Sequence, residues 1–448
     1  MSLWVRLRER FWFLPGVLCV VAVGLAEGLI TLDQHVGDFS LGPLSGLISR
    51  VGAAGSRDLL GAIASSMLTV AATTFSITIA VLALASTNYG PRLVRNFMTD
   101  RANQFVLGVY VATFLYSLLV LRSIRVNEDG PAEPFVPHLA VNVAVALAVL
   151  AIGVLVYFIH HISDSVQVWT LAREVHNDLV DSVDHLYPDR VGREPQETPG
   201  ATGAADVPPG LATDGVPVPS ERTGYVQSVA QDKLLAVAGE HDVVISLQVR
   251  PGSHVYTGVN LAVVWPPDNA GDALLAGVAE AVVIGQARSP HQDAEFAVLM
   301  LEEMAVRALS PSTNDPYTAI NALDGLAAGL VLMAGRHAPS TYRYDSARRL
   351  RVIAPRVVLT DLLDRVLDAM RLYAIDHPSV LHRTLTLTEQ VGTASDKAEV
   401  HARLAVHVER LLGAFADSSL QDCDRHRLQE HAAAVRRALA DTPSEDRQ

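Results

Sequence analysis

Four long apolar runs before residue 162 constrain the fold of this chain more than any other feature. They cover Phe11–Leu32, Leu59–Ser86, Asn103–Leu121 and His138–His160, and each contains 19 to 28 residues. A helix of that length crosses a hydrocarbon core of roughly 30 Å. Helices buried in a soluble protein rarely stay apolar on every side for so long. The sequence therefore predicts four transmembrane helices, which form an N-terminal domain over residues 1–162.

The rest of the chain is more polar, and it carries most of the acidic charge. Half of the 448 residues are hydrophobic, yet the formal net charge is -13. The acidic balance argues against nucleic acid as a partner, because contacts to phosphates need clustered positive charge. The only cysteines, Cys19 and Cys423, are too few for a zinc site built on paired cysteines. We therefore predict no metal site and no disulfide framework.

Arginines flank the apolar runs unequally. Three precede the first run and three lie between the second and the third, whereas each of the other two loops carries only two. Cytoplasmic loops of membrane proteins carry an excess of Lys and Arg. The sequence therefore predicts that both termini, and everything after His161, lie in the cytoplasm, with the loops around Asp38 and Glu128 outside.

The second apolar run is rich in hydroxyl side chains. At about 100° per residue, Ser66, Thr69, Thr73 and Ser76 fall within one narrow sector of the helix. A small, weakly polar stripe on a membrane helix has two physical uses. It lets helix backbones approach closely, or it lines a hydrated pathway. Both interpretations remain open, and close packing is the simpler one.

Glu27 is the only carboxylate well inside a predicted span. Placing an ionised carboxylate in hydrocarbon costs several kcal/mol, so such a residue usually faces protein, water or a cation. The cost is reduced here because Glu27 lies only about 7 Å from the outer end of its span. A functional role and simple extension of the side chain towards the membrane surface are equally good interpretations.

The chain after His161 divides into four predicted segments. Residues 163–192 keep helical spacing, which predicts a cytoplasmic extension of the fourth helix. Residues 193–222 are rich in Pro, Gly, Ala and Thr, which is typical of a flexible linker. Residues 223–267 show strand-like alternation and predict a small β unit, and helical periodicity returns over 268–440. The predicted fold is mainly α, with a four-helix transmembrane domain followed by a cytoplasmic α+β domain.

Part of the β unit is similar to a known shape. The run from Arg250 to Leu261, with its Pro251-Gly252 turn and Gly258, resembles the half-repeat of lipoyl and biotinyl domains, which form a barrel-sandwich. An attachment lysine is not evident, because Lys233 precedes the helix-like stretch Leu234-Leu235-Ala236. We therefore expect the shape of such a domain without its cofactor.

The most conspicuous polar motif lies between two helical patterns, from Ala308 to Ala319. Its simple interpretation is a helix end followed by a new start, with Asn314 or Asp315 as N-cap and a proline in the first turn. A helix N-terminus surrounded by Ser310, Thr313, Asn314 and Asp315 can also bind an anion or another small ligand. We expect capping to be its main role.

Three stretches together carry a family resemblance. They are Thr74–Thr78 running on to Ala85–Arg92, then Arg250-Pro251-Gly252 with Gly258, and then Ala308–Ala319. They resemble a bacterial family of predicted membrane proteins, known as domain of unknown function 2254. The resemblance implies a multi-pass protein of the bacterial inner membrane. The family brings no established activity, so the resemblance supports the architecture and leaves the mechanism open.

Motifs typical of enzymes are missing from the sequence. It contains no Walker loop, no H-E-x-x-H, no G-x-S-x-G and no G-x-G-x-x-G. We expect no catalytic residues, and an enzyme is the least favoured class. The leading hypothesis is a homo-oligomeric channel or transport-like protein for an ion or small solute, with a cytoplasmic domain that assembles and gates it. The alternative is a membrane-anchored ligand sensor or scaffold that acts through its cytoplasmic domain.

Overall fold

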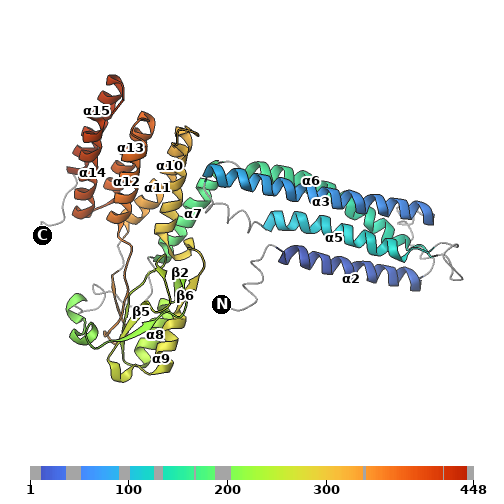
Figure 1. The fold of residues 1–448 in the computed structure, drawn as a ribbon, viewed down its shortest axis with the longest axis horizontal. Coiled ribbons are helices and arrows are strands. Elements are labelled where there is room, and N and C mark those ends of the chain that lie inside the picture. The colour runs from blue at the N-terminus through green and yellow to red at the C-terminus, as the bar shows by residue number, and fades with distance from the viewer. Residues whose placement is uncertain are drawn as a thin grey trace. The chain divides into compact units, whose positions relative to one another are not determined.

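The computed structural model describes residues 12–36, 52–89, 101–125, 135–165, 168–186, 203–336, 340–416 and 418–440. The chain forms two compact units, Met1–Thr170 and Leu171–Gln448. Figure 1 shows the first unit as a set of long helices and the second as a mixed region of helices and strands.

Four helices make up the described part of the first unit. They are α2 (Phe13–Val36), α3 (Ala53–Tyr89), α5 (Arg101–Ser123) and α6 (His138–Ser165). Each overlaps one of the four predicted spans, as expected for long apolar runs. By length and composition, however, five of the described helices could cross a membrane, because α11 (Pro316–Gly335) in the second unit also qualifies. The chain thus has several apolar helices, and the predicted count of four spans is not confirmed by these criteria alone.

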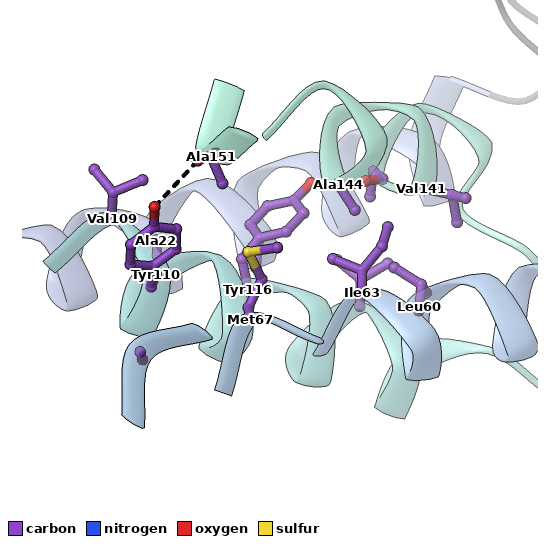
Figure 2. Close-up of a cluster of buried hydrophobic side chains, with 14 of the residues drawn as sticks. Ala22, Leu60, Ile63, Met67, Val109, Tyr110, Tyr116, Val141, Ala144 and Ala151 are labelled. Atoms are coloured by element: carbon purple, nitrogen blue, oxygen red, sulfur yellow. Dashed lines mark hydrogen bonds between the residues drawn. The ribbon is translucent and has the colours of Figure 1, made fainter. Parts of the chain in front are cut away.

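Helix α5 is the centre of the first unit, because it packs against α2, α3 and α6. Gly108 of α5 is a point of close approach, since a Cβ atom there would lie 2.6 Å from the Leu18 side chain. Two buried tyrosines of α5 donate hydrogen bonds to carbonyl groups of α6. Tyr110 donates to Ala151 at 3.3 Å, as the dashed line in Figure 2 shows, and Tyr116 donates to Ala140 at 2.9 Å. The two buried hydroxyls therefore tie α5 to α6, and each has a hydrogen-bond partner in the apolar interior.

The β-rich part of the second unit contains two sheets. Their strands are β1 (Val216–Pro219), β2 (Gly224–Val229), β3 (Val244–Leu247), β4 (His254–Val255), β5 (Asn260–Trp265), β6 (Val282–Gly285), β7 (Tyr342–Tyr344) and β8 (Leu350–Ile353). The first sheet has the order β1-β5-β3-β8-β7 and the second β4-β2-β6. Only β3 and β8 pair in parallel among these strands. Helices α8 (Gln231–Glu240) and α9 (Asp272–Ala281) complete an apolar core with the sheets, and fully buried Leu234, Ile245 and Val278 belong to it.

The prediction of a flexible linker over residues 193–222 is wrong for its described part. Residues 203–222 contain two short 3-10 helices and the strand β1, which pairs with β5. Pro217 and Pro219 led to the error, because proline usually argues against a strand. Strand β1 lies at the edge of its sheet, where a residue without a backbone N–H is tolerated. Residues 193–202 lie outside the described residues.

The β unit is also larger than the predicted 223–267. Strand β6 and the pair β7 and β8 come from the region predicted to be helical, and they contribute to the two sheets. Strands β7 and β8 are short, with three and four residues, and each buries an arginine, Arg343 and Arg351. Neither strand therefore shows the alternation of apolar and polar residues by which a strand is predicted from sequence. The barrel-sandwich shape is not confirmed, because the strands form two sheets that include these later segments.

The helical part of the second unit follows the predicted periodicity. It contains α10 (Ala294–Ala308), α11 (Pro316–Gly335), α12 (Leu359–Tyr373), α13 (Pro378–Ala394), α14 (Ala398–Ala416) and α15 (Asp422–Ala440). Helix α11 packs against α10 and α13, and α12 packs against α10 and α14. Residues 163–192 were predicted to extend the fourth helix. In the structure α6 ends at Ser165, and a separate helix, α7 (Val168–Leu186), buries Val175, Leu179 and Val183.

Candidate functional site

The hydroxyl stripe lies on the outer face of α3. Ser66, Thr69, Thr73 and Ser76 are all exposed, whereas Ile63, Met67 and Ala71 on the opposite side are buried in the apolar core of the first unit (Figure 2 shows Ile63 and Met67). The two threonines donate hydrogen bonds to their own helix, Thr69 to the Ser65 carbonyl and Thr73 to the Thr69 carbonyl, each at 2.9 Å. The stripe is therefore not used for packing against the described helices of this chain.

The threonine hydrogen bonds limit what the stripe can do. A hydroxyl that donates to the carbonyl four residues earlier has no donor left over, but its oxygen can still accept a hydrogen bond. Such a side chain is tolerated next to lipid, next to water and next to a second helix. The stripe thus offers small side chains with acceptor oxygens on a surface that the other described helices leave uncovered.

Glu27 has a partner that the sequence did not reveal. The Glu27 carboxylate forms an ion pair with Arg122 of α5 at 3.2 Å, and the two side chains are 50% and 74% exposed. Near the same end of α2, the Asp33 carboxylate accepts a hydrogen bond from the Ala140 N–H in the first turn of α6 at 3.2 Å. An ion pair this exposed is worth about 0–1 kcal/mol in water. The ion pair with Arg122 explains how a carboxylate is tolerated within this apolar helix. Glu27 and Arg122 both lie towards the predicted outer ends of their spans, and that shared position is the sequence signal that could have indicated the pair.

The junction between α10 and α11 has the predicted cap. The Asp315 carboxylate accepts a hydrogen bond from the Thr318 N–H at 3.1 Å, and the Asp315 N–H donates to the Ala308 carbonyl at 2.8 Å. Asn314 has a φ of 47°, so it makes the left-handed turn between the helices. The Ser310 hydroxyl lies 3.2 Å from the hydroxyl of Thr313. Asp315 is therefore the N-cap, and the structure explains the motif without a ligand.

The Arg250-Pro251-Gly252 motif packs against the start of α10. Asp293 is 1% exposed; it accepts two hydrogen bonds of 2.8 Å from the Arg288 guanidinium and one from the Phe296 N–H at 3.0 Å. A Cβ atom on Gly252, where φ is 88°, would lie 2.4 Å from Asp293 Oδ2. Glycine is required at this turn both by its backbone angle and by the space that the buried ion pair occupies.

Next to this ion pair, three arginines surround one carboxylate. Glu295 lies 2.9 Å from Arg250, 3.7 Å from Arg288 and 3.6 Å from Arg365. Glu302 is the next acidic group, 3.9 Å from Arg365, and burial raises the pKa of its carboxyl. The cluster joins the turn after β3, the segment between β6 and α10, the first three turns of α10 and the middle of α12.

A cavity of about 260 Å³ opens beside these charges. It is lined by Arg250, Glu295, Val357, Val358, Asp361, Leu362 and Arg365. On the same helix as Asp361, Asp364 accepts a hydrogen bond from His407 at 2.8 Å, so it has a partner outside the cavity. The charged lining of this cavity was missed because its members lie far apart in the chain. No short motif connects Arg250, Glu295 and Arg365.

Two further expectations concern bound groups. Lys233 lies on α8 and forms an ion pair with Glu280 at 3.1 Å, so it does not occupy a hairpin tip like the attachment lysine of a lipoyl or biotinyl domain. In the described part of the chain, no group of three or more His, Cys, Asp or Glu side chains is placed to hold a metal ion.

A comparison with known families agrees with the motifs and the apolar helices. The model of the predicted membrane protein family called domain of unknown function 2254 matches residues 8–390. The chain belongs to this family. It is also 31% identical over 421 residues to uncharacterized proteins of Mycobacterium bovis and Mycobacterium tuberculosis, and the match covers 92% of this chain and 78% of each relative. No solved structure matches the chain. The family membership establishes a membrane protein with several apolar helices.

Proposed function

We propose that the chain is a homo-oligomeric channel or transport-like protein of the bacterial inner membrane. In this proposal α3 borders the pathway, and the second unit lies in the cytoplasm, where it assembles and gates the complex. One observation carries the proposal: Thr69, Thr73 and their neighbours form a weakly polar face that the described helices of this chain leave exposed. In a membrane, such a face is best placed against a second copy of α3 or along a hydrated pathway.

The proposal assigns the membrane crossing to α2, α3, α5 and α6, and places α11 outside the membrane. Helix α11 carries Asp324, which forms an ion pair with Arg383 of α13. An ion pair between two helices is costly in hydrocarbon and ordinary at the surface of a soluble helical domain. Helices α10 and α13 cover much of the apolar surface of α11, with Leu323, Leu326 and Leu330 fully buried. Burial in a soluble core thus accounts for its apolar composition.

The proposed topology predicts which cysteines react from outside the cell. With Cys19 and Cys423 first replaced by serine, we expect a cysteine at exposed Asp268 to stay unlabelled by an impermeant thiol reagent on intact cells. A cysteine at Asp38 is expected to react, because the arginine distribution places that loop outside. Permeabilised cells are the control, in which both positions should react. Labelling of the Asp268 position on intact cells would refute the cytoplasmic placement of the second unit.

The role of the stripe predicts different effects for two substitutions on α3. We expect Thr73→Leu to lower conductance or to weaken the oligomer, because Thr73 is exposed in the centre of the stripe. Val70→Leu is the matched control, since Val70 is half-buried against the core of the first unit. Conductance in planar bilayers and oligomer mass in detergent should be measured for both variants.

The two measurements separate the two uses of the stripe. Lost conductance with an intact oligomer indicates a pathway, because a larger apolar side chain narrows and dewets a constriction. A dissociated oligomer indicates packing, because the helix backbones are then held apart. If Thr73→Leu retains both properties, α3 does not border the pathway and the channel proposal fails.

A second candidate function is supported by the cavity in the second unit. A membrane-anchored sensor needs a site for a small ligand, and the cavity beside Arg250, Glu295 and Arg365 combines charged and apolar walls in about 260 Å³. The capped junction at Asn314 and Asp315 has a sufficient structural role already, so the cavity is the better place for a ligand. A purified protein that binds a ligand and conducts nothing in bilayers would favour the sensor.

A further inference from the structure

The cavity contains two opposite charges on one helix that do not pair with each other. Asp361 and Arg365 are four residues apart on α12, and both line the cavity. Opposite charges at this spacing usually attract each other across one helical turn. Here Arg365 instead reaches towards Glu295 at 3.6 Å and Glu302 at 3.9 Å. The carboxylate of Asp361 has no ion pair or hydrogen bond with any described residue.

The N–H groups of Arg365 make no hydrogen bond to other described residues and can therefore donate to a ligand. Both of its ion pairs are longer than a hydrogen bond, and within the described part of the chain its guanidinium donates none. Arg250, by contrast, donates to Glu295 at 2.9 Å and is 34% exposed. The five N–H donors of a guanidinium match the two oxygens of a carboxylate in a planar, bidentate arrangement. Arg365 is thus the group in the cavity best suited to receive an anion.

The other residues that line the cavity indicate which further chemical groups a ligand would carry. Asp361 offers an acceptor for a cationic group, one helical turn from Arg365. Val357, Val358 and Leu362 supply apolar surface between the charged residues. A ligand that pairs with Arg365 and Asp361 and also contacts the apolar residues carries a carboxylate, an ammonium and an aliphatic group, and it fits within about 260 Å³. Those are the groups of a free aliphatic amino acid.

We propose that this cavity binds a free α-amino acid with an aliphatic side chain. Its carboxylate pairs with Arg365, its ammonium with Asp361, and its side chain lies against Val357, Val358 and Leu362. The proposal rests on the sensor function described above and is independent of the channel. A simple anion, such as acetate, would use only Arg365, and a simple amine would use only Asp361.

Titration calorimetry on the full chain in detergent or nanodiscs, with L-leucine as the probe, tests this proposal. We expect saturable binding, and we expect Arg365→Gln and Asp361→Asn each to weaken it about tenfold or more, since each removes a charge-assisted hydrogen bond. Arg383→Gln is the matched control, because Arg383 is an arginine of similar exposure on α13, away from this cavity. It should bind L-leucine like the wild type. Acetate and isobutylamine, which each carry part of the ligand, should bind about tenfold more weakly or not at all.

Three outcomes would overturn the proposal. The first is an absence of L-leucine binding in the millimolar range by a protein that is folded and assembled. The second is equal affinity for acetate and L-leucine, which identifies a site for anions. The third is unchanged binding in both cavity variants. Asp361 and Arg365 are exposed, so both variants are expected to melt like the wild type. Conductance should be recorded on the same preparations. The channel proposal is then tested by conductance and the amino-acid site by calorimetry, so the failure of one can be told apart from the failure of the other.

Discussion

Asp293→Ala is expected to lower the free energy of unfolding by about 3–5 kcal/mol, because it removes one partner of a buried ion pair. The carboxylate is 1% exposed and holds the Arg288 guanidinium by two hydrogen bonds of 2.8 Å. Without it, Arg288, whose side chain is 17% exposed, loses its closest ion-pair partner and is left with a longer contact of 3.7 Å to Glu295. The same substitution removes the N-cap of α10, which is worth about 1 kcal/mol.

Asp315→Ala is the matched control for this prediction. Asp315 also caps a helix, but no arginine pairs with it among the described residues, so its removal is expected to cost only about 1 kcal/mol. Chemical unfolding of the full chain in detergent, followed by circular dichroism, measures both variants. The double variant Arg288→Met with Asp293→Ala should recover part of the loss, because it removes a largely dehydrated charge whose closest partner is gone. If Asp293→Ala and Asp315→Ala cost the same, the buried ion pair does not stabilise the fold.

The parts of the fold that depend on neighbouring residues could be predicted from the sequence. Continuous apolar runs indicated the positions of α2, α3, α5 and α6, because a run of about 20 apolar residues has the length and composition of a helix that could cross a membrane. The cap at Asp315 followed from the same local rules, since a helix start needs an acceptor for its free N–H groups. That Ser66, Thr69, Thr73 and Ser76 share one side of α3 also followed from helical geometry alone.

The parts that depend on distant residues could not be predicted. Arg250, Glu295 and Arg365 meet only because a turn after β3 packs against α10 and α12, and no spacing in the sequence indicates that contact. Strand β1 contains two prolines, and only its place at the sheet edge makes it a strand. The ion pairs of Arg351 could not be predicted from the sequence either. It is a buried charge in β8 whose partners, Asp242 and Asp345, are each 2.7 Å away.

Gly329→Leu is also expected to destabilise the fold, because Gly329 lies in close contact with Leu179 of α7. A Cβ atom on Gly329 would lie 2.1 Å from Cδ2 of Leu179, and Leu179 is fully buried. Because Leu179 is fully buried, it has little space to move aside for a leucine at position 329, so we expect a loss of about 1–3 kcal/mol. Gly413→Leu on α14 is the matched control, since nothing lies within 4 Å of the equivalent Cβ position. That variant should melt close to the wild type.

The size-swapped variant Leu179→Ala with Gly329→Leu tests whether the contact itself is responsible. Leu179→Ala alone is expected to cost about 2–5 kcal/mol, because it leaves a cavity at a fully buried position. In the double variant the new leucine fills that cavity, so the combined loss should be smaller than the sum of the two single losses. Thermal unfolding of all four variants in detergent provides the comparison.

Because α7 is the next helix after α6 in the chain, the same variants also test the proposed gating. Gly329→Leu should alter conductance, and Gly413→Leu should not. Additive losses, or equal effects of the two glycine substitutions, would show that α7 is not held by the contact of Leu179 with Gly329.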